Sequence, residues 1–243
     1  MDDADRARVE AVLGVPVGDD DAVRVLDPRG LGFQRLEWQG DSALDAVVAL
    51  HRWGTPACCA ALGTADLVSD AALAVSATAA GLGHLLDWPP GPGRLADCVE
   101  TCVGAAWHVS VEAAAVVASR LVHAEVSVAD VGPRPQVADL ADALACDAVP
   151  APAHVGSAVM EAAAADHLYA RPDLVEADEG RLTVLRALVL DGERVLQVAD
   201  DLGWVPGCGG HRHHLLDHVQ ARVGLLALVA GLPAALLESG RLW

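Results

Sequence analysis

The sequence predicts an all-α protein, and three observations lead to that prediction. Helical periodicity of apolar side chains runs through most of the 243 residues, and hydrophobic residues make up 53% of them. No segment alternates strictly between apolar and polar residues for long enough to form a convincing strand. Turns rich in Gly and Pro separate the periodic runs. We therefore expect helices packed around a substantial apolar core, rather than a disordered chain.

Three long helical segments are expected along the chain. The first covers residues 34–53 ("QRLEWQGDSALDAVVALHRW"), the second residues 94–122 and the third residues 214–232. No apolar run is long enough to cross a bilayer, and the N-terminus "MDDADRARVE" is acidic where a signal peptide is basic. Six cysteines without a Cys-x-x-Cys pair are typical of reduced thiols. These features predict a soluble, cytoplasmic protein with no membrane partner.

The two halves of the chain match each other in several segments. "LADCVETCVG" aligns with "LLDHVQARVG", and "WQGDSALDAVVALH" aligns with "HVGSAVMEAAAADH", so that Gly40 stands opposite Gly156. "LVSDAALAVSATAAGLG" also aligns with "LVLDGERVLQVADDLG" after one residue of slippage. Because the matches keep the same order, we interpret them as a duplication. The predicted parts are a first domain at residues 1–127, a linker containing Pro at 128–136 and a second domain at 137–243.

Four carboxylates in the first half have the spacing of a metal site. Glu37 and Asp41 are four residues apart, and Asp97 and Glu100 are three apart, so each pair lies on one helix face. If the two helices pack side by side, the four groups converge. Clustered carboxylates repel each other unless a divalent cation neutralises them, and oxygen ligands suit Mg²⁺ or Mn²⁺. The alternative is that each acid lies on a solvated helix face.

These segments resemble motifs of the ribonuclease III family. "QRLEWQGDSALD" is similar to the family signature, an Arg-Leu-Glu-aromatic-x-Gly-Asp-Ser core, and "RLADCVETCVGAAW" is similar to its second acidic motif. In the second half, "DEGRLTVLRALV" resembles the Glu-Gly-x-Leu-Thr-x-Leu-Arg stretch of the same family. The resemblance implies two ribonuclease-III-like domains in tandem that form an intramolecular pseudo-dimer. A further homodimer stays open as an alternative.

The resemblance also implies an activity and its residues. Members of the family bind Mg²⁺ through four acids and hydrolyse phosphodiester bonds in structured RNA, which is the expected partner here. Carried over position by position, Glu37, Asp41, Asp97 and Glu100 are the expected catalytic residues and the expected ligands of Mg²⁺ or Mn²⁺.

The second half departs from the family pattern at the site. Ala153 stands opposite Glu37, Ser157 opposite Asp41 and Gln220 opposite Glu100, and only Asp217 keeps its acid, opposite Asp97. We therefore expect at most one active site, with the second domain acting as a packing partner.

Other features leave the substrate open. A formal net charge of -18 predicts weak, salt-sensitive affinity for RNA, and no segment resembles a double-stranded RNA-binding domain. One alternative is therefore an enzyme that acts on a small molecule in specialised metabolism, and another is a non-catalytic scaffold. The run "HRHHLLDH" at residues 211–218 is a second metal candidate, with Cys208 nearby, but a solvent-facing loop and helix start is the preferred interpretation. For His108 we expect a role at an interface.

Overall fold

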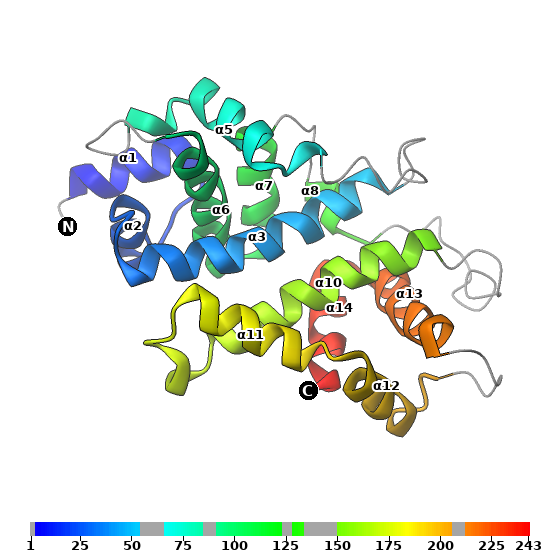
Figure 1. Cartoon of the computed structure of the whole chain (residues 1–243). Helices are drawn as coiled ribbons and strands as arrows, with labels where there is room; N and C mark the ends of the chain where they lie inside the picture. Colours follow the sequence, from blue (N-terminus) through cyan, green and yellow to red (C-terminus); the bar gives the residue numbers. More distant parts are fainter. Residues whose placement is uncertain (1–2, 54–65, 85–90, 123–127, 134–149, 206–211) are drawn as a thin grey trace.

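The chain folds into packed helices, as Figure 1 shows. The structure is a computed structural model that describes residues 3–53, 66–84, 91–122, 128–133, 150–205 and 212–243. Helices account for most of these residues, and the described ranges contain no strand. The all-α prediction is therefore confirmed for this part of the chain. None of the described helices is both long enough and apolar enough to cross a bilayer.

The helices fall into two sets along the chain. The first half contains α1 (Asp3–Leu13), α2 (Asp19–Leu26), α3 (Leu31–Arg52), α5 (Asp70–Ala79), the 3₁₀ turn η2 (Leu82–His84), α6 (Pro92–Val109), α7 (Val111–Leu121) and α8 (Val128–Val131). The second half contains α10 (Pro150–Tyr169), η3 (Pro172–Leu174), α11 (Glu179–Val189), α12 (Gly192–Asp201), α13 (Arg212–Ala230), α14 (Leu232–Ser239) and η4 (Gly240–Leu242). The long helices α3 and α10 lie against each other, with the remaining helices of each half arranged around them (Figure 1).

Two glycines allow α3 and α6 to approach each other very closely. A Cβ at Gly40 would lie 1.8 Å from the carbonyl oxygen of Glu100, and a Cβ at Gly104 would lie 2.3 Å from that of Leu36. Real side chains do not tolerate such distances to backbone atoms, so any larger residue would push the helices apart. The acids therefore lie beside a very close approach of two helix backbones.

The second half repeats this crossing between α10 and α13. A Cβ at Gly156 would lie 1.7 Å from the carbonyl oxygen of Gln220, and a Cβ at Gly224 would lie 2.0 Å from that of Pro152. These positions stand opposite those of the first crossing in the sequence alignment of the two halves. The same contact between helices is therefore built twice in one chain.

Trp38 joins the two halves. Its side chain is 3% exposed and belongs to an apolar cluster whose other buried members all come from the second half, namely Ala165, Leu168, Leu174, Ala177 and Leu182. Next to it, the buried guanidinium of Arg35 donates hydrogen bonds to the carbonyl oxygens of Tyr169 at 3.1 Å and Ala177 at 3.3 Å. Helix α3 therefore holds the connection that leads from α10 into α11.

The predicted linker begins with ordered structure. Residues 128–131 form the short helix α8, which packs against α3 and α7, and Asp130 lies 3.1 Å from Nδ1 of His51 on α3. The start of the expected linker thus packs on the first half, and the carbonyl oxygen of Val131 also lies close to Gly231, which precedes α14. Residues 134–136 lie outside the described residues, as does the start of the predicted second domain.

Candidate metal site

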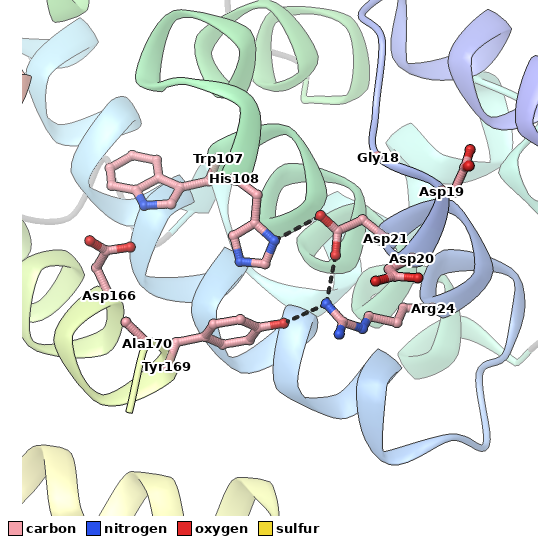
Figure 2. A pocket seen from close by; sticks show the side chains of 10 residues that line it. All are labelled: Gly18, Asp19, Asp20, Asp21, Arg24, Trp107, His108, Asp166, Tyr169 and Ala170. Carbon is pink, nitrogen blue, oxygen red and sulfur yellow. Dashed lines mark hydrogen bonds and ion pairs between the residues drawn. The ribbon is translucent and has the colours of Figure 1, made fainter. Parts of the chain in front are cut away.

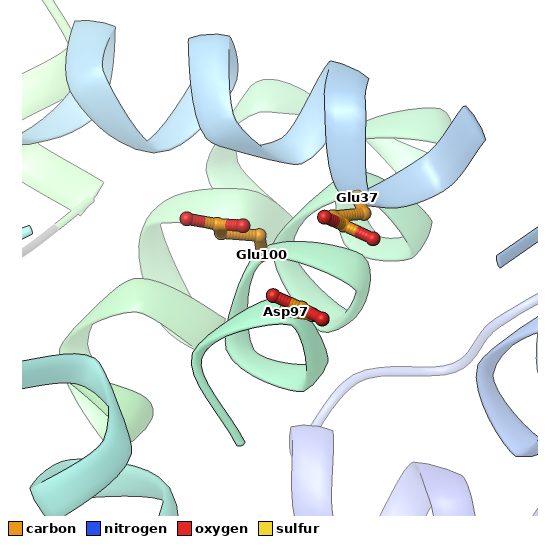
Figure 3. Close-up of side chains that lie close together, drawn as sticks. All are labelled: Glu37, Asp97 and Glu100. Carbon is orange, nitrogen blue, oxygen red and sulfur yellow. The ribbon is translucent and has the colours of Figure 1, made fainter. Parts of the chain in front are cut away.

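Three of the four predicted acids converge between α3 and α6. Glu37 points from α3 toward Asp97 and Glu100 on α6, as Figure 3 shows, and one carboxylate oxygen of each lies within 4.8 Å of the others. The glycine crossing explains this proximity, because Gly40 follows Glu37 by one helical turn and touches the backbone of Glu100. Within the described ranges, no other group of three acid, His or Cys side chains is as close. We call Glu37, Asp97 and Glu100 the acidic triad.

Burial raises the pKa values of all three carboxyl groups, and repulsion by other acids adds to the increase. The pKa of Glu100 rises to about 9, mainly through burial and then through repulsion by Asp41 and Glu37. Burial, followed by repulsion from Asp97, raises the pKa of Glu37 to about 7. Burial also raises the pKa of Asp97, although Arg94, 3.2 Å away, opposes this effect. The triad therefore retains protons near neutral pH unless a cation neutralises it.

The geometry of the triad fits a small divalent cation. Oxygen ligands lie about 2.0–2.1 Å from Mg²⁺, so two oxygens on one ion are at most about 4.2 Å apart. The observed separations of up to 4.8 Å need only small side-chain rotations to reach that value. Carboxylate oxygens are also the donors that Mg²⁺ and Mn²⁺ prefer. Both the spacing and the donor type therefore suit these ions.

Asp41, the fourth predicted ligand, is engaged elsewhere. Its Oδ2 atom lies 3.9 Å from Nη1 of Arg186 on α11, and it is not a member of the triad. It still lies close enough to Glu100 to raise the pKa of that group by repulsion. The structure thus brings together three of the four acids and places the fourth beside the triad, next to an arginine.

Helix α11 of the second half packs against α3 next to the triad, a neighbour that the sequence did not reveal. The indole nitrogen of Trp38 donates to Oγ1 of Thr183 at 3.2 Å, and the carboxylate of Glu179 contributes to the raised pKa of Glu37. The signal was present in "DEGRLTVLRALV", whose family resemblance marked it as important. However, a one-dimensional alignment does not show that a helix of the second half lies across the acids of the first.

Two further acids near Arg186 were also missed. Burial, with repulsion from Asp41 and Glu161, raises the pKa of Asp45 to about 7. Burial likewise raises the pKa of Glu161 on α10, and Arg186 opposes the increase at both residues. The alignment places Asp45 opposite Glu161, so this acidic region at the junction of α3 and α10 comes from corresponding positions of the two halves.

The other metal candidate receives no support from the described residues. His214 and His218 lie on α13, but neither belongs to a group that meets the geometric requirement of a metal site. His211 and Cys208 lie outside the described residues, and no side-chain position is described for His213. At the second-half counterpart of the triad, Ala153 is buried and contributes no ligand.

His108 lies at the junction of the two halves, in agreement with its expected interface role. Its Nδ1 is 2.9 Å from Oδ2 of Asp21, its Nε2 is 2.7 Å from Oε1 of Gln39, and its ring centroid is 4.7 Å from that of Tyr169 on α10. A cavity of about 700 Å³ lies beside it, and Figure 2 draws the acidic and aromatic side chains among those that line it. Both imidazole nitrogens are engaged, so the ring serves as a structural link here.

Comparison with known proteins adds no family assignment. No protein-family model and no curated protein matches the chain.

Proposed function

We propose that the protein is a divalent-metal-dependent phosphodiesterase of the ribonuclease III type that hydrolyses structured RNA at a single site. The acidic triad carries this proposal, because three half-buried carboxylates with raised pKa values lie within 4.8 Å of one another. Such a group of carboxylates destabilises the folded state unless a cation neutralises its charge. The triad also occupies the positions at which the sequence resembles the metal ligands of that family.

We also propose that the two halves are duplicated domains paired within one chain. The recurrence of the glycine crossing supports this idea, since Gly40 with Gly104 and Gly156 with Gly224 make the same contacts. The extended packing between α3 and α10 supports pairing of the halves. In this arrangement the first half supplies the acids and the second half supplies α11.

Each residue of the site then has a defined task. Glu37, Asp97 and Glu100 bind Mg²⁺ or Mn²⁺, and the glycine crossing sets the distance between the two helices that carry them. Arg94, 3.2 Å from Asp97, orients that carboxylate. When bound, the ion lowers the pKa of a coordinated water and stabilises charge on the scissile phosphate. With one such site, the enzyme cuts one strand at a time.

The test is cleavage of a structured RNA hairpin at low salt with Mn²⁺ present. We expect cleavage by the wild-type chain and at least about a hundredfold loss for Glu100→Gln, the loss typical of removing a key electrostatic group. Asp217→Asn is the matched control, because it changes the second-half counterpart of Asp97 and should keep activity. Absence of cleavage by the wild-type chain at high enzyme concentration would reject RNA as the substrate.

The cavity beside His108 favours a second candidate, in which the substrate is a small molecule. Its volume of about 700 Å³ is that of a small-molecule site, and Tyr169 and Trp107 offer aromatic surface. Hydrolysis of bis-p-nitrophenyl phosphate distinguishes the two candidates. The small-molecule alternative would be supported if the wild-type chain hydrolyses this ester, Glu100→Gln abolishes that activity, and the wild-type chain leaves the RNA hairpin uncleaved.

A further inference from the structure

Arg186 lies at the meeting point of three carboxylates and is fixed from several sides. Its Nη1 atom lies 3.9 Å from Oδ2 of Asp41 and donates a short hydrogen bond to Oγ of Ser42. The carbon at the centre of its guanidinium lies 5.4 Å from the ring centroid of Trp38, a cation–π distance. Arg186 also favours ionisation of Asp45 and Glu161. Its side chain is only 18% exposed, so the charge is largely shielded from water.

Contacts between the halves hold Arg186 at this position. Arg35 on α3 donates a hydrogen bond to the carbonyl oxygen of Ala177, just before α11. Trp38, also on α3, donates one to the hydroxyl of Thr183 within α11. Asp178 begins the helix, because its carboxylate accepts a hydrogen bond from the backbone nitrogen of Arg181 at 2.8 Å. The guanidinium is therefore a fixed positive charge that the second half places beside the acids of the first.

We propose that Arg186 takes the place of a second divalent cation at this site. The inference rests on the proposed function, in which the acidic triad binds one ion. Arg186 pairs with Asp41 and thereby keeps it from serving as a ligand, so that the site binds a single ion. A guanidinium satisfies a carboxylate without the strict coordination that Mg²⁺ requires.

The arrangement of acids agrees with a single ion. Within the described ranges, the triad is the one group of three potential ligands that are close enough to share a metal, and Asp41, Asp45 and Glu161 do not form a second. Removing the charge of Arg186 leaves Asp41 without its counter-charge beside the triad. The negative potential at the triad then increases, and a divalent cation binds there more tightly.

Titration of the full-length chain with Mn²⁺ by calorimetry tests this proposal, with no activity measurement needed. We expect one Mn²⁺ per wild-type chain and, for Arg186→Met, an affinity about tenfold higher, which corresponds to roughly 1.4 kcal/mol. Arg186→Lys keeps the charge and should stay near the wild-type affinity. Adding Asp41→Asn to Arg186→Met should return the affinity to the wild-type value, since it removes the carboxylate that lost its partner.

Arg181→Met is the matched control, because it removes one positive charge from the exposed face of the same helix and should change the affinity by less than about twofold. Equal or weaker Mn²⁺ binding by Arg186→Met would overturn the inference, as would two ions per wild-type chain. Complete absence of Mn²⁺ binding by the wild-type chain would instead refute the proposed function. A misfolded Arg186→Met protein, detected by circular dichroism, is replaced by Arg186→Gln with the same expectation.

Discussion

Replacing Glu100 by Gln should stabilise the metal-free protein, although Glu100 is a proposed metal ligand. The folded chain raises the pKa of this carboxyl group from its ordinary value of 4.5 to about 9. The unfolded chain therefore loses the proton at lower pH than the folded chain does. Stability from this group is fully present below pH 4.5 and is lost as the pH rises toward 9. Gln has a similar shape and does not ionise, so the Glu100→Gln variant does not lose this stability as the pH rises.

The magnitude follows from the pH interval over which the two states differ. At pH 7 the carboxyl group of Glu100 is ionised in the unfolded state, where its pKa is about 4.5, but it is still protonated in the folded state. Each pH unit between 4.5 and 7 lowers the free energy of unfolding by about 1.36 kcal/mol. Glu100 therefore destabilises the metal-free fold by about 3 kcal/mol at pH 7. Glu100→Gln should recover this energy and raise Tm by roughly 6–12 °C in a chain of this size.

Urea unfolding with EDTA at pH 5.5, 7 and 8.5, followed by circular dichroism, measures the effect. The wild-type free energy of unfolding should fall across this range, and the Glu100→Gln variant should show a shallower decline. Glu112→Gln, which changes an exposed acid on α7, is the control and should leave the wild-type slope unchanged. A Glu100→Gln variant no more stable than wild type at pH 7 would refute the argument that burial raises this pKa.

Three further predictions concern packing and metal binding. Gly40→Ala and Gly156→Ala should each destabilise the fold by at least about 2 kcal/mol in urea unfolding, because each new Cβ would collide with a carbonyl oxygen of the facing helix. Near-wild-type stability of either variant would contradict that close contact. Trp38→Ala should cost about 3–5 kcal/mol by the same measurement, since the indole fills a cluster of second-half side chains; a cost below about 1 kcal/mol would mean that the halves do not depend on it. Mn²⁺ at a hundredfold excess over its Kd should stabilise the wild-type chain by about 2.7 kcal/mol in thermal unfolding at pH 7. The Glu100→Gln variant should show no such stabilisation by Mn²⁺. Equal stabilisation of both proteins would mean that the ion binds elsewhere.

Local patterns in the sequence were sufficient to predict the helices and the core of the site. The spacing of Glu37 relative to Gly40, and of Glu100 relative to Gly104, follows from helix geometry alone. Once both pairs lie on helices, the small residues mark where the helices cross, and the acids one turn away must approach each other. The triad was therefore predictable, and three of the four predicted acids meet in the structure.

The role of α11 could not be predicted in the same way. The pairing of Asp41 with Arg186 joins positions separated by 145 residues along the chain, and it depends on how the two halves pack. Internal sequence matches show which segments correspond, but not which face of one copy meets the other. Likewise, the raised pKa of Asp45 results from burial at the junction of α3 and α10, which no local pattern reveals.

The anchoring of α11 by Trp38 has an evolutionary consequence. The first half carries the acids and the second half carries the arginine that pairs with one of them, so neither half holds all of these charged groups. Loss of the second half would expose the indole of Trp38 and leave Asp41 without Arg186, and loss of the first half would leave Arg186 without Asp41. Recombination that separated the two halves would therefore disrupt contacts on which both depend.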